Sequence, residues 1–218
     1  MIGVFVTGTD THVGKTHVGC ALARRAVARG HRVFAFKPIE TGCTPTAAGD
    51  LGADQALLAA AAGDWQTGPL RGVYQFPLPA APLVAAEDAG RSLDLAVVER
   101  IAREGAAQAS WTIIEGAGGW RVPITLDADM AGLARQLALP VLVVARAGLG
   151  TINHSLLTLE AIERDGVRIA ALVLSQQRTD DPGAAASNRT QIQRRWPGRV
   201  LILSTDPSVL DPLLPDSP

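Results

Sequence analysis

The chain has 218 residues, which fits one domain of ordinary α/β size and is long enough to bury a substantial core. Apolar residues make up 47% and aromatic residues only 4%, so the core must consist mainly of aliphatic side chains, as in parallel strands covered by helices. The formal net charge is −1 and the arginines are scattered, which argues against nucleic acid and anionic membranes as partners.

Two further features predict a cytoplasmic protein. The cysteines, Cys20 and Cys43, have neither a CxxC spacing nor a metal-ligand spacing, which favours a reducing compartment. The opening residues, IGVFVTG, predict a strand and a turn rather than a signal peptide, and no apolar run approaches the roughly 18 residues of a membrane span.

In chain order, short runs rich in Val and Ile alternate with longer segments of helical periodicity. This alternation predicts right-handed βαβ units in a single α/β domain, 1–218, with a mainly parallel sheet flanked by helices. In such a fold, ligands gather at the carboxyl ends of the strands. We expect strands at 2–7, 32–36, 111–115, 140–145, 168–174 and 199–203. We expect helices near 14–29, 53–62, 94–109, 128–137, 152–165 and 184–195.

Two segments interrupt this alternation. Residues 66–92 include FPLPAAPL, whose prolines exclude a central strand, so we expect an excursion over the edge of the sheet. Residues 207–218, PSVLDPLLPDSP, are rich in proline, and we expect an irregular tail there.

The first expected strand leads into GTDTHVGKT, residues 8–16, and then into an alanine-rich helix. This is the context of a phosphate-binding loop, in which backbone N–H groups of the loop and of the helix N-terminus converge on an anion. Lys15 would add a positive charge over the outer phosphates, and Thr16 would offer a hydroxyl to Mg²⁺. Gly8 and Gly14 stand further apart than in the standard motif, and a simple glycine turn before a helix is the alternative.

Two carboxylates are candidates for holding a metal ion at this loop. Glu115 ends the expected strand 111–115 and is followed by GAGG, whose small residues let backbone approach a phosphate. An ordinary charged strand end is the alternative for Glu115. Asp54 lies near the start of an expected helix, where helix capping is the simpler role.

Lysine is rare in this chain: of 20 basic residues, only Lys15 and Lys37 are lysines. Lys37 precedes Pro38, which cannot donate to a sheet, so the chain leaves the sheet there and the Lys37 ammonium should lie on the same rim as the phosphate loop. A compact ammonium suits a phosphoryl group in transit better than a planar guanidinium does. A solvated surface charge is the alternative for Lys37.

The segment PVLVVARAGLGTINH repeats the opening pattern of strand, glycine turn and helix. Gly148 and Gly150 permit close backbone approach, and Thr151 and Asn153 bring polar groups to the start of the helix, which suits a carboxylate or a phosphate. A glycine turn with Thr151 as the helix cap is equally compatible with the sequence. For His154, packing or capping is a simpler role than catalysis.

Together, GTDTHVGKT, KPIETG, EGAGGW and GTINH resemble the dethiobiotin synthetases, biotin-pathway enzymes with the phosphate-loop NTPase fold, in order and in spacing. The resemblance implies a Mg²⁺-dependent ligase that acts on 7,8-diaminopelargonate, CO₂ or bicarbonate, and a nucleoside triphosphate. One amine takes up CO₂ as a carbamate, a carbamate oxygen attacks the γ-phosphorus, and the second amine closes the cyclic urea with release of phosphate. Because no protein nucleophile is needed, the lack of a convincing Ser/His/Asp or Cys/His set in this sequence agrees with it.

The resemblance also implies roles for individual residues. Lys15 and Lys37 would stabilise the transferring phosphoryl group and the carbamate. Thr16, Asp54 and Glu115 would hold Mg²⁺. The implied nucleotide-binding residues are His12, Val13, Gly14, Lys15, Thr16, His17, Asp54, Glu115, Gly116, Ala117 and Gly118.

The same resemblance places the organic substrate. Thr11 and Thr41 would meet the diamine, and the turn with Gly150, Thr151 and Asn153 would receive the substrate carboxylate from the other subunit of a homodimer. Each dimer would then carry two shared active sites.

Three positions depart from the family pattern. His12 stands where an acid occurs in a relative, and Leu83 stands where histidine is frequent. Ser175 replaces an asparagine that commonly reads adenine. The base preference is therefore open: ATP is the default expectation, and CTP or loose base specificity is the alternative.

Two other classes of protein share this fold type. A ParA/MinD-like ATPase switch is the main alternative, but such proteins usually carry an extra lysine early in the loop, where this chain has Asp10. The synthetase part of a cobyrinate-type amidotransferase would need a glutaminase domain, for which no chain is left.

Overall fold

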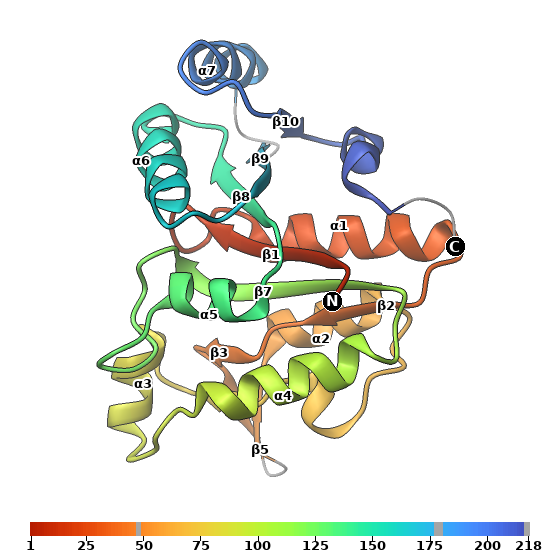
Figure 1. Cartoon of the computed structure of the whole chain (residues 1–218), viewed down its shortest axis with the longest axis vertical. Coiled ribbons are helices and arrows are strands. Elements are labelled where there is room, and N and C mark those ends of the chain that lie inside the picture. The colour runs from red at the N-terminus through yellow and green to blue at the C-terminus, as the bar shows by residue number, and fades with distance from the viewer. Residues whose placement is uncertain (47–48, 177–180, 216–218) are drawn as a thin grey trace.

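Six parallel strands form the central sheet of the computed structural model, which describes residues 1–46, 49–176 and 181–215 (Figure 1). The strand order is β10-β9-β8-β1-β7-β2, so β1 lies at the centre between β8 and β7. All six strands expected from the sequence are confirmed, and β7 continues beyond its expected end. The strands are β1 (Gly3–Gly8), β2 (Val33–Phe36), β7 (Trp111–Gly119), β8 (Val141–Arg146), β9 (Ile169–Ser175) and β10 (Val200–Leu203).

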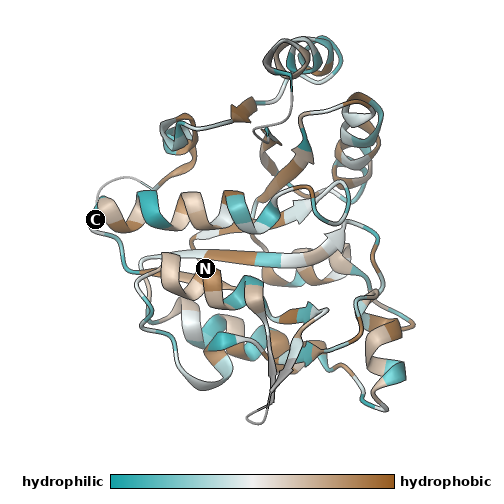
Figure 2. Ribbon diagram, turned by 180° about the vertical axis from the view of Figure 1, so that it is seen from behind, coloured by the Kyte–Doolittle hydropathy of each residue, from teal (hydrophilic) through white to brown (hydrophobic). Residues whose placement is uncertain are grey.

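Helices cover both faces of this sheet, because successive side chains of a strand point to opposite faces and both sets are apolar. In β1, Phe5 belongs to the core under α4, α5, α6 and α7, whereas Val4 and Val6 belong to the core under α1 and α2. Figure 2 shows hydrophobic colour along the strands and hydrophilic colour at intervals along the helices that cover them. The six expected helices are confirmed as α1 (Lys15–Ala28), α2 (Ala53–Ala61), α4 (Leu95–Ala106), α5 (Met130–Leu137), α6 (Thr151–Arg164) and α7 (Pro182–Gln193).

Five of the helices begin in one of two ways. In α4, α5 and α7, the residue before the helix is an aspartate, Asp94, Asp129 or Asp181, whose carboxylate accepts a backbone N–H of the first turn. In contrast, α1 and α6 follow Gly14 and Gly150, both in the left-handed conformation and without any side-chain cap. The first N–H groups of α1 and α6 therefore remain available to an anion.

The segment 66–92 stays outside the central sheet, as predicted from its prolines. It forms the 3₁₀ helix η1 (Gly68–Arg71), the strand β6 (Tyr74–Phe76) and the unpredicted helix α3 (Pro82–Asp88). The strand β6 pairs in parallel with β3 (Ile39–Thr41) in a separate two-stranded sheet. A small antiparallel pair, β4 (Thr44–Thr46) and β5 (Gly49–Leu51), was also not predicted.

The expectation of an irregular tail was wrong for its first part. Pro207–Leu213 form the 3₁₀ helix η2, in which Leu210 is fully buried in the core beneath α1. Asp211 forms ion pairs with Arg25 and Arg29 of α1. Residues 216–218 lie outside the described part of the chain. Within the described part, no helix is both long enough and apolar enough to span a membrane.

Candidate active site

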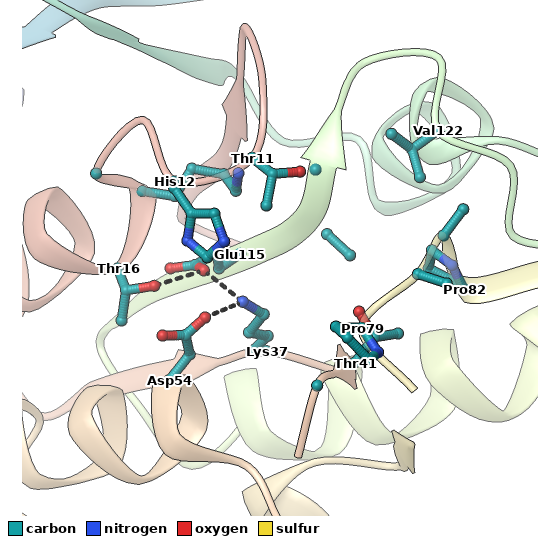
Figure 3. Close-up of a pocket in the computed structure, with 17 residues that line it drawn as sticks. Thr11, His12, Thr16, Lys37, Thr41, Asp54, Pro79, Pro82, Glu115 and Val122 are labelled. Atoms are coloured by element: carbon teal, nitrogen blue, oxygen red, sulfur yellow. Dashed lines mark hydrogen bonds and ion pairs between the residues drawn. The ribbon is translucent and has the colours of Figure 1, made fainter. Parts of the chain in front are cut away.

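A cavity of about 730 Å³ opens at the carboxyl ends of β1, β2 and β7, where the chain leaves the sheet (Figure 3). Five segments line it: the loop after β1 with the start of α1, the residues around β3, the start of α2 (Ala53–Ala61), the segment between β6 and α3, and the end of β7 with the loop that follows. The lining residues are Thr11, His12, Gly14, Lys15, Thr16, Lys37, Thr41, Gly42, Asp54, Pro79, Ala80, Ala81, Pro82, Glu115, Ala117, Gly118 and Val122.

The loop after β1 wraps around the side chain of Lys15. His12 and Gly14 both have positive φ angles, 56° and 100°, which turn the backbone so that the Lys15 ammonium reaches the carbonyl oxygen of Asp10 at 2.9 Å. Lys15 is only 6% exposed. Burial, with the neighbouring positive charge of Lys37, outweighs nearby carboxylates and lowers the pKa of Lys15 to about 8.

A cluster of charges stands beside this loop. The Nζ atom of Lys37 lies 3.0 Å from Oε1 of Glu115 and also contacts the Asp54 carboxylate (Figure 3). Thr16 Oγ1 donates to the same Glu115 oxygen at 2.9 Å. Glu115 is fully buried, and its Oε2 atom has no hydrogen-bond partner among the described residues.

The pKa shifts in the cluster show how strongly its members interact. Burial lowers the pKa of Lys37, but the charges of Glu115 and Asp54 outweigh burial and hold this pKa above its ordinary value. Burial would raise the pKa of Asp54, yet the charge and the hydrogen bond of Lys37 outweigh burial and hold this pKa below its ordinary value. The Lys37 ammonium and the Asp54 carboxylate are therefore charged at neutral pH.

Sheet register explains why residues distant in sequence meet here. The strand β7 pairs in parallel with β1 and β2, with Glu115 opposite Val6 and Ile114 opposite Phe36. Lys37 directly follows Phe36, so it leaves the sheet next to Glu115 and beside the loop that follows β1. The helices α1 and α2 then bring Thr16 and Asp54 to the same point.

Two functional candidates were missed in the sequence: Glu40, which lies in the quoted motif KPIETG, and Gln55, which follows Asp54. Glu40, in KPIETG, is 5% exposed and accepts N–H bonds from Asp54 and Gln55. Burial raises the pKa of Glu40. Gln55 accepts the backbone N–H of Lys37 at 2.6 Å. For Glu40, the only signal in the sequence was a carboxylate inside the motif KPIETG. For Gln55, it was only the position next to Asp54.

The structure brings eleven of the proposed site residues into this one cavity and leaves six outside its lining. Val13 is buried in the core, His17 points to solvent, and Gly116 is enclosed within β7. Gly150, Thr151 and Asn153 lie at the start of α6, after the neighbouring strand β8, and within one chain they do not reach the cavity.

The three departures from the family pattern have different surroundings. His12 lines the cavity. The backbone N–H of Leu83 donates to Pro123, and Leu83 is not among the cavity-lining residues of the described chain. Ser175 is 5% exposed and stands directly against Gly14, where a Cβ atom would approach Ser175 Oγ to 2.4 Å.

The donor chemistry of the cluster fits Mg²⁺. Thr16, Asp54 and Glu115 present hard oxygen donors, and one buried carboxylate oxygen of Glu115 has no partner. Across the described residues, no three His, Cys, Asp or Glu side chains are arranged to enclose a metal ion by themselves. Mg²⁺ usually takes only one or two carboxylates and completes its shell with water and substrate phosphates, so this donor set suits a nucleotide-bound ion rather than an all-protein site.

Comparisons with known proteins agree in one direction. A family described as "AAA domain" matches residues 2–205. The chain is 45% identical over 196 residues to "ATP-dependent dethiobiotin synthetase BioD" of Anaeromyxobacter dehalogenans (strain 2CP-C), covering 89% of this chain and 85% of that one. It is 38% identical over 172 residues to the protein of the same name from Xanthomonas campestris pv. campestris (strain 8004), covering 79% and 77%.

Solved structures add support for the fold alone. The signal recognition particle receptor FtsY from Elizabethkingia anophelis superposes with a TM-score of 0.55 at 15% identity, covering 96% of this chain and 61% of the receptor. The apo structure of McdA from Cyanthece gives a TM-score of 0.50 at 12% identity, covering 98% and 91%.

Proposed function

The chain belongs to the family of ATP-dependent dethiobiotin synthetases, and we propose that it makes dethiobiotin in the cavity at the ends of β1, β2 and β7. It is a ligase of biotin biosynthesis. The main support for placing the reaction here is that both lysines of the chain converge with Asp54 and Glu115 in one largely buried cluster. We also propose that it works in the cytoplasm, where ATP and bicarbonate are at hand.

In this proposal, the phosphate loop and the free N–H groups of α1 bind the triphosphate. Lys15 neutralises charge on the outer phosphates, and Lys37 follows the γ-phosphoryl group as it passes to the carbamate oxygen. Thr16, Asp54 and Glu115 would hold Mg²⁺, which when bound neutralises charge on the phosphates. The cluster thereby lowers the barrier by stabilising charge, and no protein nucleophile takes part.

The diamine fits the remaining part of the cavity. Thr11 and Thr41 offer hydroxyl groups there, and the residues Pro79–Pro82 with Val122 form an apolar wall suited to an alkyl chain. One amine would lie near Lys37, where it takes up CO₂ as a carbamate. After phosphoryl transfer, the second amine attacks the carbamic-phosphoric anhydride, and phosphate leaves as the cyclic urea closes.

The substrate carboxylate needs a separate anion site, and we propose that the partner subunit of a homodimer supplies it. The N-terminus of α6 has no side-chain cap, and its Gly150, Thr151 and Asn153 would receive the carboxylate. Two large apolar side chains on this surface support a protein contact: Leu149 is 98% exposed and Leu157 is 58% exposed.

Phosphate release, measured with and without diaminopelargonate and bicarbonate, tests the function. A synthetase should release phosphate only when both are present, because the carbamate is the phosphoryl acceptor. Steady phosphate release with ATP alone would instead support the ParA/MinD-like switch. The relatives at 38–45% identity make that alternative the weaker one.

A further inference from the structure

We propose that Glu40 is a positioning residue that sets the location of the Asp54 carboxylate by capping the helix α2 from outside. The inference rests on the assignment of Asp54 to nucleotide-bound Mg²⁺ proposed above. Glu40 itself is not among the described residues that line the cavity, so any effect on the reaction must pass through another residue.

The Glu40 carboxylate uses both oxygens on the first turn of α2. Its Oε1 accepts the backbone N–H of Asp54 at 2.8 Å, and its Oε2 accepts the backbone N–H of Gln55 at 3.0 Å. These N–H groups have no partner within a helix, and the residue before α2, Gly52, has no side chain that could cap them. Glu40 therefore acts as an N-cap from the strand β3, which lies earlier in the chain and is separated from α2 by β4 and β5.

The fit around this carboxylate is close. A Cβ atom on Gly52 would lie 2.4 Å from Glu40 Oε2, so only glycine leaves room for the carboxylate at the start of the helix. On its other side, Gln55 joins the same turn to β2, because its side chain accepts the Lys37 N–H and donates to the Ala35 carbonyl at 3.3 Å. The turn is thus held by Glu40 and by β2, while the Asp54 side chain is left to contact Lys37.

Burying a carboxylate costs free energy of folding, so a buried carboxylate such as Glu40 needs a structural reason. Glu40 is 5% exposed and stands close to the like charge of Asp54. Two charge-assisted hydrogen bonds from the helix N-terminus offset that cost, and they are directional, whereas an apolar side chain would fill the space without fixing the helix. The charge therefore gives the α2 turn a defined position relative to β3.

Glu40→Ala and Glu40→Gln test the inference through Mg²⁺ binding and amide exchange. Mg²⁺ is titrated by calorimetry into the protein with a non-hydrolysable ATP analogue, and amide hydrogen exchange is followed at Asp54 and Gln55 without nucleotide. Loss of an outer partner of a metal ligand typically weakens metal affinity about 10- to 100-fold, so we expect at least about a tenfold loss for Glu40→Ala. The Mg²⁺ affinity of Glu40→Gln, which keeps one acceptor oxygen, should lie between those of the wild type and Glu40→Ala. Both variants should lose protection from hydrogen exchange at the amides of Asp54 and Gln55.

A matched control is Glu163→Gln. Glu163 Oε1 also accepts an N–H, from Trp196 Nε1 at 2.8 Å, but Glu163 lies away from the cavity lining. The Glu163→Gln variant should leave the Mg²⁺ affinity unchanged. Unchanged Mg²⁺ affinity in Glu40→Ala, or an equal loss in Glu163→Gln, would overturn the inference. If Glu40→Ala does not fold, Glu40→Gln alone decides by the same measurements.

Asp54→Ala separates this inference from the proposed site. If Glu40 acts through Asp54, Glu40→Ala should add almost no further loss of Mg²⁺ affinity in the Asp54→Ala background. Full additivity would refute that route. If Asp54→Ala itself leaves Mg²⁺ affinity unchanged, the metal assignment of Asp54 fails and the inference fails with it. If Asp54→Ala weakens Mg²⁺ binding and Glu40→Ala does not, only the role proposed for Glu40 is overturned.

Discussion

The ammonium of Lys37 lies 3.0 Å from Oε1 of Glu115, and the same Glu115 oxygen accepts the hydroxyl of Thr16. One carboxylate oxygen thus joins the proposed phosphoryl-stabilising lysine to the proposed metal site. Both charged side chains are buried, so removing Lys37 would leave the Glu115 carboxylate without its ion pair in a poorly solvated place. The Lys37 ammonium also contacts two carboxylates at once, so keeping the charge without this geometry should not preserve function at position 37.

Lys37→Arg tests this geometric requirement. The guanidinium keeps the charge but is broad and planar, so it should fit between Asp54 and Glu115 poorly and follow the phosphoryl group less well. We expect turnover to fall tenfold or more, a loss of at least about 1.4 kcal/mol in transition-state stabilisation. The matched control is Arg100→Lys, in an exposed pair with Glu104. Wild-type turnover in Lys37→Arg would remove the assigned role.

Gly14→Ala should weaken nucleotide binding for a steric reason that can be separated from backbone strain. Gly14 has φ +100° and Ser175 directly against it, whereas Gly63 has a similar φ of +91° with nothing within 4 Å of an added Cβ. Both alanine variants should lose stability, by about 1 kcal/mol from the left-handed conformation alone. Only Gly14→Ala should also raise the Kd for ATP in calorimetry. Equal ATP affinities in the two variants would contradict this reading of the loop.

Mixing two impaired variants tests the shared active site. Lys37→Ala should remove the phosphoryl contact, and Asn153→Asp should repel the substrate carboxylate from the α6 turn. If each site combines Lys37 of one subunit with Asn153 of the other, every mixed dimer holds one intact site. With random exchange, half the dimers are mixed, so activity should recover to about one quarter of wild type. No recovery after exchange, verified by mass, would place both residues in one subunit's site.

Discrimination among nucleotide bases should be weak. The family pattern leads us to expect an adenine-reading asparagine at position 175, where this chain has Ser175, whose short side chain is buried against Gly14. Strong discrimination requires hydrogen-bonding groups that a wrong base leaves unpaired. ATP, CTP and GTP, titrated with diamine present, should therefore differ by less than about tenfold in Kd. Strict selection of ATP would show that other groups read the base.

Asp211→Asn should lower thermal stability at neutral pH, but not in acid. A hydrogen bond from Arg25, reinforced by the charges of Arg25 and Arg29, holds the pKa of Asp211 below its ordinary value of 3.8. Because the folded-state pKa is the lower one, this stabilisation is present above about pH 4 and is lost as pH falls through the folded-state pKa. The difference in Tm from wild type should shrink toward pH 3. Asp127→Asn, an exposed carboxylate without an ion pair in the described chain, is the control.

Much of the fold and of the site could be predicted from local sequence. Strand runs, glycine turns and helical periodicity are local properties, and parallel strands place their carboxyl ends on one edge. The loop 8–16, Lys37 before Pro38 and Glu115 at the end of a strand could therefore be assigned to one rim. The family resemblance supplied the role of Asp54, for which helix capping was otherwise the simpler reading.

Other features required the tertiary structure, because they depend on contacts between distant segments. Only the strand order sets β7 between β1 and β2, which brings Glu115 to Thr16 and Lys37. The cap that Glu40 gives to α2 and the docking of Leu210 and Asp211 on α1 leave no periodic mark in the sequence. Periodicity reports which face of an element is buried, whereas packing of whole elements decides what that face meets.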